Sequence, residues 1–102
     1  MFMLTSIHKK KKIQLAEFIS KNLLLRNSAD ELFNHINNLK TNKITIDFDR
    51  IQSVTRAFTH QYLINKKKSN KNIIDSNISP HVKNMFDLIE KTKSASQEVN
   101  IY

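Results

Sequence analysis

A segment near the middle of this 102-residue chain restricts what the chain can fold into more than any other. Ile44, Ile46 and Phe48 alternate with polar residues, which is the two-residue period of a strand that has one face in a core. Asp47 and Asp49 then close the strand. The pattern predicts a half-buried strand over about residues 43–48.

A helix is predicted directly after this strand. Ile51 and Val54 keep the short connection against the core, and Thr55 is placed to cap a helix that begins near Arg56. The apolar side chains of that helix are Phe58, Tyr62 and Leu63. We expect the junction between strand and helix, over residues 49–62, to carry the function.

Length and composition indicate one domain with one core. The hydrophobic content is 39%, and no apolar run approaches the length of about 18 residues that suggests a membrane span. The first seven residues are apolar but precede the lysine run, the reverse of the order in a secretory signal. There is no cysteine for a disulfide framework. We therefore expect a cytoplasmic protein.

The rest of the chain gives a series of local predictions. Residues 1–12 read as an N-terminal arm or an edge strand, and residues 13–25 mix both apolar periods, so they are expected to be largely buried without an assigned structure. Ser28 with Glu31 three residues later forms a capping box, which predicts a helix over about 28–39. With no glycine in the chain, turns that need left-handed backbone fall to asparagine, as at Asn37, Asn38 and Asn42.

The C-terminal part is predicted to hold one more strand and one more helix. Residues 72–78 have the length and composition of a strand. Ser79 followed by Pro80 is a strong helix start, and the apolar stripe that follows predicts a helix over about 80–92. Residues 93–102 read as a polar tail, and residues 13–92 as the single domain. Helices alternating with strands predict an α/β fold, a small mixed sheet covered by amphipathic helices. The other face or an edge is then available for a partner, unless residues 1–25 cover it.

The order of these elements resembles the STAS superfamily of anti-sigma-factor antagonists, and more closely the STAS-like family of mostly uncharacterised prokaryotic domains. The resemblance covers about residues 13–91, and its most specific part is the run Ile46-Asp-Phe-Asp-Arg-Ile-Gln-Ser-Val-Thr-Arg-Ala-Phe-Thr-His-Gln-Tyr62. Positions that match the family pattern are Asp47, Phe48, Ile51 and Phe58. The resemblance implies a STAS-like fold and a regulatory module that acts by partner switching.

The departures from the family pattern bear directly on function. Ala57 stands where the STAS-like family usually has serine, and His60 and Gln61 stand where it has an acidic pair. The loop that carries the phosphorylated serine in partner-switching STAS proteins falls here on residues 55–58, which places Arg56 at the acceptor position. A standard serine phospho-switch is therefore not expected. Thr55 and Ser53 remain as candidate phosphorylation sites, although roles as helix cap and loop hydrogen-bonding group are favoured for them.

Arg56 is the leading candidate for partner binding. A positive charge beside a helix N-terminus makes an anion site plausible, although the same charge opposes the helix dipole, and an arginine that is solvated or paired to Asp47 or Asp49 is the plainer alternative. The expected partner-binding residues are Asp49, Thr55, Arg56, Thr59 and His60. The resemblance implies a partner of the ATPase, histidine-kinase-like or transcription-regulator class.

Catalytic and metal sites are not expected. Asp47 and Asp49 share a strand face but lack a further acid or histidine at motif spacing, so hydrogen bonding within the turn is the favoured role. The histidines have no metal-ligand spacing, and a chain without glycine cannot form a glycine-rich phosphate loop. We therefore expect no catalytic residues, no metal and no cofactor.

The net charge of +8 keeps a nucleic-acid-binding role open as the alternative. Candidate contacts are the two lysine clusters, Lys9, Lys10, Lys11, Lys12 and Lys66, Lys67, Lys68, Lys71. Lysine, asparagine and isoleucine are all abundant, as an AT-rich coding bias would produce, so a solvated surface is the favoured interpretation of the clusters. A third hypothesis is a structural role, in which an edge strand or an open sheet face forms a homodimer. The alternative to the homodimer is a monomer.

Overall fold

The computed structural model describes residues 10–100, with the side chains of residues 10–91. The predictions for residues 1–9, including Lys9, and for residues 101–102 lie outside this range. In chain order the elements are β1 (Lys10–Gln14), α2 (Leu15–Phe18), β2 (Asn22–Leu23), α3 (Arg26–Asn37), β3 (Lys43–Asp47), β4 (Ser53–Val54), α4 (Arg56–Lys68), β5 (Asn72–Ser76) and α5 (Pro80–Asn100). Among the described residues, no helix has the length and apolar character needed to cross a membrane.

Three of the strands form a parallel sheet in the order β1-β3-β5. After β1 and again after β3, the chain passes through at least one helix before it forms the next strand of this sheet. Crossover connections of this kind place neighbouring strands parallel. The α/β class predicted from the sequence is confirmed. The predicted mixed sheet is not seen, because every strand pairing among residues 10–100 is parallel, including the short second pair β2-β4.

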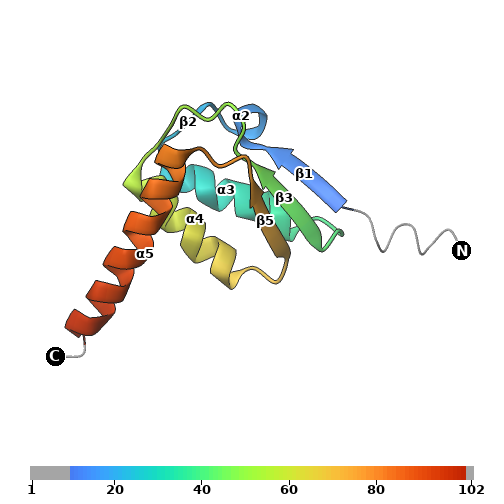
Figure 1. The fold of residues 1–102 in the computed structure, drawn as a ribbon. Helices are drawn as coiled ribbons and strands as arrows, with labels where there is room; N and C mark the ends of the chain where they lie inside the picture. Colours follow the sequence, from blue (N-terminus) through green and yellow to red (C-terminus); the bar gives the residue numbers. More distant parts are fainter. Residues whose placement is uncertain (1–9, 101–102) are drawn as a thin grey trace, which may run out of the picture.

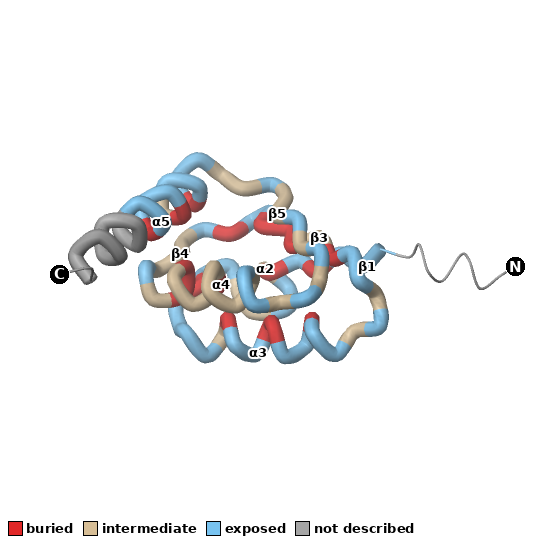
Figure 2. The backbone as a smooth tube through the Cα atoms, turned by 90° about the horizontal axis from the view of Figure 1, so that it is seen from below, coloured by how far each residue is buried: buried red, intermediate tan, exposed pale blue. Residues whose placement is uncertain are grey.

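Two helices, α3 and α4, lie on one side of the three-stranded sheet, whereas α2 and α5 lie beyond the ends of its strands (Figure 1). α3 and α4 cover one face of the sheet, and α4 packs against both α3 and α5. In Figure 2 the buried stretches of α3 face the strands, whereas its outer side is exposed. The core is therefore a single layer of side chains between the sheet and the helices.

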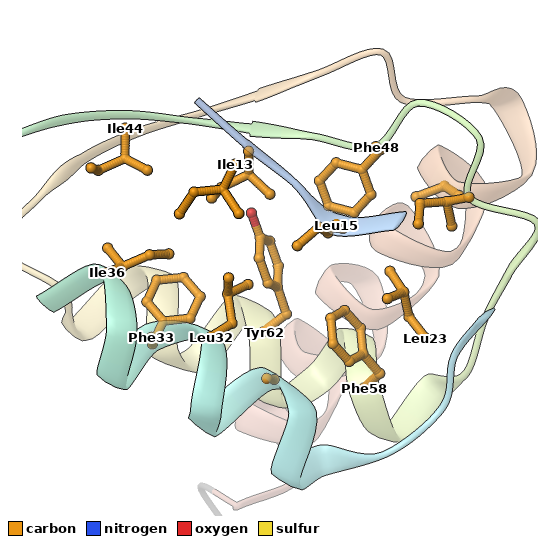
Figure 3. Packing of buried hydrophobic residues seen from close by; sticks show 14 of the residues in the cluster. Ile13, Leu15, Leu23, Leu32, Phe33, Ile36, Ile44, Phe48, Phe58 and Tyr62 are labelled. Atoms are coloured by element: carbon orange, nitrogen blue, oxygen red, sulfur yellow. The ribbon is translucent and has the colours of Figure 1, made fainter. Parts of the chain in front are cut away.

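Tyr62 lies at the centre of this core. Its ring contacts those of Phe33, Phe48 and Phe86, with centroids 5.4, 5.7 and 5.8 Å away. Figure 3 shows the Tyr62 side chain rising from α4 toward the strands, among Leu32, Phe33, Ile13 and Leu15. The alternation predicted for the central strand is confirmed, because Ile44, Ile46 and Phe48 are all buried in the same cluster.

Two of the helices predicted from the sequence have different bounds in the structure. The helix predicted over 28–39 runs from Arg26 to Asn37, and Ser28 lies inside its first turn, with no side-chain cap at Leu25. Pairing of β2 with β4 holds the chain up to Leu23, so the helix can begin soon after it. The last helix begins at Pro80 as predicted but continues to Asn100 instead of ending near residue 92.

Two further expectations differ from the structure. Residues 13–25 are not largely buried, since Phe18, Leu24 and Leu25 are 41%, 49% and 64% exposed. Left-handed backbone occurs at Arg50 (φ 66°) and Asn77 (φ 55°) and not at the predicted asparagines of residues 37–42. Asn77 directly follows the end of β5, and Arg50 lies three residues after the end of β3, in the turns where the chain leaves the sheet.

Candidate functional site at the helix N-termini

The short pair β2-β4 brings the starts of α3 and α4 together. Leu23 pairs with Val54, and the backbone N–H of Thr55 donates to the carbonyl of Leu23 over 2.9 Å. The Thr55 hydroxyl donates to the carbonyl of Leu24 over 2.7 Å and accepts from the N–H of Phe58 over 3.1 Å. Thr55 is therefore the N-cap of α4, as predicted, and also the link between the two helix starts.

α3 and α4 run parallel from this point. Near their N-termini, Nη1 of Arg26 lies 3.4 Å from Nδ1 of His60. One turn further along, Nδ2 of Asn65 donates to Oδ1 of Asp30 over 2.9 Å. The first contact joins residues near the start of each helix, and the second joins residues about one turn later in each. The N-termini of α3 and α4 therefore lie at the same end of the molecule.

This end of the molecule carries concentrated positive charge. Arg26 and Arg56 are each the first residue of their helix, where the exposed N–H groups already give a partial positive charge. The side chain of Arg56 is exposed and makes no ion pair or hydrogen bond with residues 10–91. Because a guanidinium only donates, Arg26 is the donor and Nδ1 of His60 the acceptor in their contact. Of the plainer alternative for Arg56, the pairing to Asp47 or Asp49 is not present, whereas the solvated side chain is.

Two exposed leucines lie beside these charges. Leu24 and Leu25 directly precede α3, and they are 49% and 64% exposed. The Thr55–Leu24 hydrogen bond places them next to the start of α4. We call the set Leu24, Leu25, Arg26, Arg56 and His60 the junction surface. Exposed apolar side chains that lie together mark protein-docking surfaces, and arginine is enriched among the residues that dominate binding there.

The structure places the predicted site residues unevenly. Arg56 and His60 belong to the junction surface, with His60 half-buried. Thr59 is fully buried, so the prediction that it lines a partner contact is wrong; α4 packs between α3 and α5, and this covers the face that holds Thr59. Asp49 is exposed at the end of β3, where its N–H donates to Asp47, and no described contact joins it to Arg56.

The hydroxyl groups of the two candidate phosphorylation sites are already engaged. Thr55 uses its hydroxyl both to donate and to accept, and Oγ of Ser53 donates to Oδ1 of Asn22 over 2.7 Å. A phosphate on either oxygen would break a contact that holds β2 beside β4. The structural roles favoured for both residues by the sequence are the ones present in the structure.

Asp47 has the role in the turn that the sequence predicts. Its Oδ1 accepts from the N–H of Asp49 over 2.9 Å and from Nδ2 of Asn77 over 2.8 Å, while Gln14 and Lys12 approach Oδ2 at 3.4 Å. Burial by itself raises the pKa of Asp47, but these hydrogen bonds outweigh it and hold the pKa below the ordinary value of 3.8. The carboxylate stays charged and holds the end of β3 against the two loops that follow β3 and β5.

A second polar contact lies under the sheet and has no counterpart in the sequence-based predictions. The hydroxyl of Tyr62 donates to Oδ1 of Asp75, and Nζ of Lys66 lies 2.7 Å from Oδ2 of the same carboxylate. Burial, with the charge and hydrogen bond of Asp75, raises the pKa of Tyr62 well above 10.0. The arrangement fits a structural role, because all three groups satisfy one another inside the fold.

The lysine clusters divide into paired and unpaired side chains. Lys12 and Lys66 are paired to Asp47 and Asp75, and Nζ of Lys71 donates to the carbonyl of Leu39. The exposed members of the clusters are Lys10, Lys11, Lys12, Lys67 and Lys68. Among the described residues, no group of three or more histidine, cysteine, aspartate or glutamate side chains is placed to hold a metal ion.

Arg26 and its two neighbouring leucines are the residues that sequence reasoning missed. The run Leu23-Leu24-Leu25 belongs to residues 13–25, which we expect from the sequence to be largely buried, yet only Leu23 of the three is buried. Comparison of the chain with protein-family models, with curated proteins and with solved structures finds no match.

Proposed function

We propose that this chain is a non-catalytic regulatory module of STAS-like type, acting in the cytoplasm, that binds a protein partner through the junction surface. The observation that carries the proposal is the unpaired, exposed Arg56 at a helix N-terminus, beside Arg26 and the exposed Leu24 and Leu25. Leucines supply apolar contact area, and the two arginines supply fixed donors for carboxylates. The partner surface is accordingly acidic around an apolar centre.

The resemblance to STAS proteins supports the same surface. Their switch loop corresponds to residues 55–58, which here form the N-cap and first turn of α4. Arg56 replaces the phosphorylated serine, so the chain would carry a constant positive charge where a switch protein alternates between neutral and negative. We infer constitutive binding to a partner of the ATPase, histidine-kinase-like or transcription-regulator class, chosen by analogy.

A pull-down from the native host tests the proposal. The tagged wild-type protein is compared with Arg56→Glu and with Lys40→Glu, which makes the same change of charge at an exposed residue just beyond the opposite end of α3. We expect one protein to co-purify with wild type and Lys40→Glu and to be lost at least tenfold with Arg56→Glu. Equal recovery by all three proteins, checked to be folded by circular dichroism, would contradict the proposal.

A further inference from the structure

One face of the three-stranded sheet is left open. Ile44 and Ile46 point toward α3 and α4, so the residues between them point the other way. The strand register sets two rows across this outer face, Lys10–Lys43–Asn72 and Lys12–Thr45–Ile74. Within residues 10–100 the side chains of these rows are exposed except for the half-buried Thr45, and Figure 1 shows α3 and α4 on the other side of the sheet.

An uncovered face is unusual for a parallel sheet. Parallel sheets are found almost always with both faces covered, so the exposure of this one indicates a surface that something else contacts. Ile74, on the edge strand β5, is 55% exposed, and Lys10, Lys12 and Lys43 on β1 and β3 are exposed as well. We call these three lysines the lysine face.

The lysine face has no carboxylate in its two rows. The next row along the strands holds Asp47, which is 1% exposed and already bound by Asn77, Asp49 and Lys12. A second copy of this chain would bring lysines against lysines if it packed on the same face, and like charges placed opposite each other are destabilising. Charge complementarity therefore favours an anionic occupant.

More basic and amide side chains lie next to the lysine face, at the amino-terminal ends of β3 and β5. The connections before β3 and before β5 lie side by side, since Oγ of Ser69 donates to Oδ1 of Asn37 and the N–H of Asn72 donates to the carbonyl of Asn42, both over 2.8 Å. Between them lies a pocket lined by Asn37, Asn42, Lys68, Ser69, Asn70 and Lys71. Lysine, asparagine and serine side chains are the groups that contact phosphate and sugar in nucleic-acid complexes.

We propose that the lysine face binds the phosphate backbone of a nucleic acid. Lys10 and Lys12 point the same way two residues apart, about 7 Å along the strand, and Lys43 lies one strand spacing of about 5 Å from Lys10. The two rows hold no aromatic side chain on which a base could stack, so the contact is to the backbone and is independent of sequence. The site is separate from the junction surface.

Helix dipoles do not account for this arrangement. Lys66, Lys67 and Lys68 lie in the last turn of α4, where the dipole favours positive charge without any ligand. Lys10, Lys12 and Lys43 lie on strands, where no such effect acts. Their convergence on one open face is the observation that needs a partner.

The test is fluorescence anisotropy with labelled single-stranded and duplex DNA of about 20 nucleotides and mixed sequence, from about 50 to 200 mM salt. Wild type is compared with Lys10→Gln/Lys43→Gln and with Lys21→Gln/Lys91→Gln, which removes the same charge from exposed residues elsewhere. Urea unfolding checks that all three proteins are equally folded. We expect Lys10→Gln/Lys43→Gln to bind DNA at least tenfold more weakly than wild type. The slope of the logarithm of the binding constant against the logarithm of the salt concentration should become smaller in magnitude by about 2. The control pair should stay close to wild type in both.

Several results would overturn the proposal. One is the absence of binding at the lowest salt, and another is an equal loss with both pairs of substitutions. If the protein binds phosphatidylserine vesicles as tightly as DNA, the occupant is a membrane instead. If it binds poly-glutamate as tightly as DNA, the occupant is an acidic protein. Loss of DNA binding in the first pair alone, with a normal pull-down through Arg56, would separate this site from the proposed protein contact.

Discussion

The hydroxyl of Thr55 donates a hydrogen bond to the main-chain carbonyl of Leu24, 2.7 Å away, and so ties the start of α4 to the segment that leads into α3. The two residues are far apart in sequence, and the contact adds to the pairing of β2 with β4. The relative position of Arg26 and Arg56 depends on this link. The stability of the fold and the shape of the junction surface should therefore change together when it is removed.

Substitution of Thr55 tests this link. Thr55→Ala removes the cap of α4 and leaves the carbonyl of Leu24 without its partner, so we expect a loss of about 1 to 2 kcal/mol in the free energy of unfolding. Thr55→Ser keeps the hydroxyl and should retain most of the stability. Urea unfolding followed by circular dichroism measures both, and equal stability of the alanine variant and wild type would show that the bond contributes nothing.

Asp47 should make stability depend on acid pH. Its pKa in the fold is below the ordinary 3.8, so the charged form contributes stability that is present above pH 3.8 and is lost as the pH falls through the lowered value. Asp47→Asn should cost about 1 to 3 kcal/mol at pH 7, and this difference should shrink in acid. Asp49→Asn, at an exposed carboxylate, is the control. A constant difference between the Asp47 variant and wild type down to pH 2 would contradict the account.

Tyr62 should make stability depend on alkaline pH. Its pKa is raised well above 10.0, so the neutral phenol contributes stability that is present below pH 10 and is lost as the pH rises toward the folded-state value. In a Tyr102→Phe variant Tyr62 is the single tyrosine. Phenolate absorbance should then appear near pH 10 in denaturant but only at higher pH in the folded protein; coincident titrations would mean that Tyr62 is not buried against Asp75.

Arg50 holds a backbone conformation that disfavours its side chain. Its φ of 66° is left-handed, which costs a residue with a Cβ about 1 to 2 kcal/mol relative to glycine, whereas its exposed ion pair with Glu17 contributes at most about 1 kcal/mol. Arg50→Gly should therefore leave the free energy of unfolding unchanged or raise it by up to about 1 kcal/mol. Arg50→Val should lower it, because a β-branched residue tolerates this conformation least. Thermal unfolding of the pair checks the order, and a valine variant as stable as the glycine variant would contradict it.

Local signals predicted the central part of the fold well. The alternation of Ile44, Ile46 and Phe48 and the cap at Thr55 each depend on a few neighbouring residues, and both are confirmed. The start of α5 at Pro80 belongs to the same group, since proline is pre-organised for the first position of a helix. These features need no contact from elsewhere in the chain.

The errors come from contacts between distant segments. The capping box at Ser28 is a valid local signal, yet α3 begins at Arg26 because β4 holds the preceding chain in β2. Thr59 is expected at the partner contact because it lies in the predicted junction, and it is buried because α4 packs against two other helices. Arg26 became part of the site only through the parallel packing of α3 and α4, which no motif in the sequence announces.

The most direct test of the central claim is an NMR titration of the ¹⁵N-labelled chain with the partner recovered in the pull-down. If the junction surface is the binding site, the amide signals of residues 24–26 and 56–60 should shift or broaden first, and Arg56→Glu should abolish the changes. Shifts that spare these residues and fall instead on β1 and the first residues of β3 would contradict the claim and place the protein contact on the lysine face.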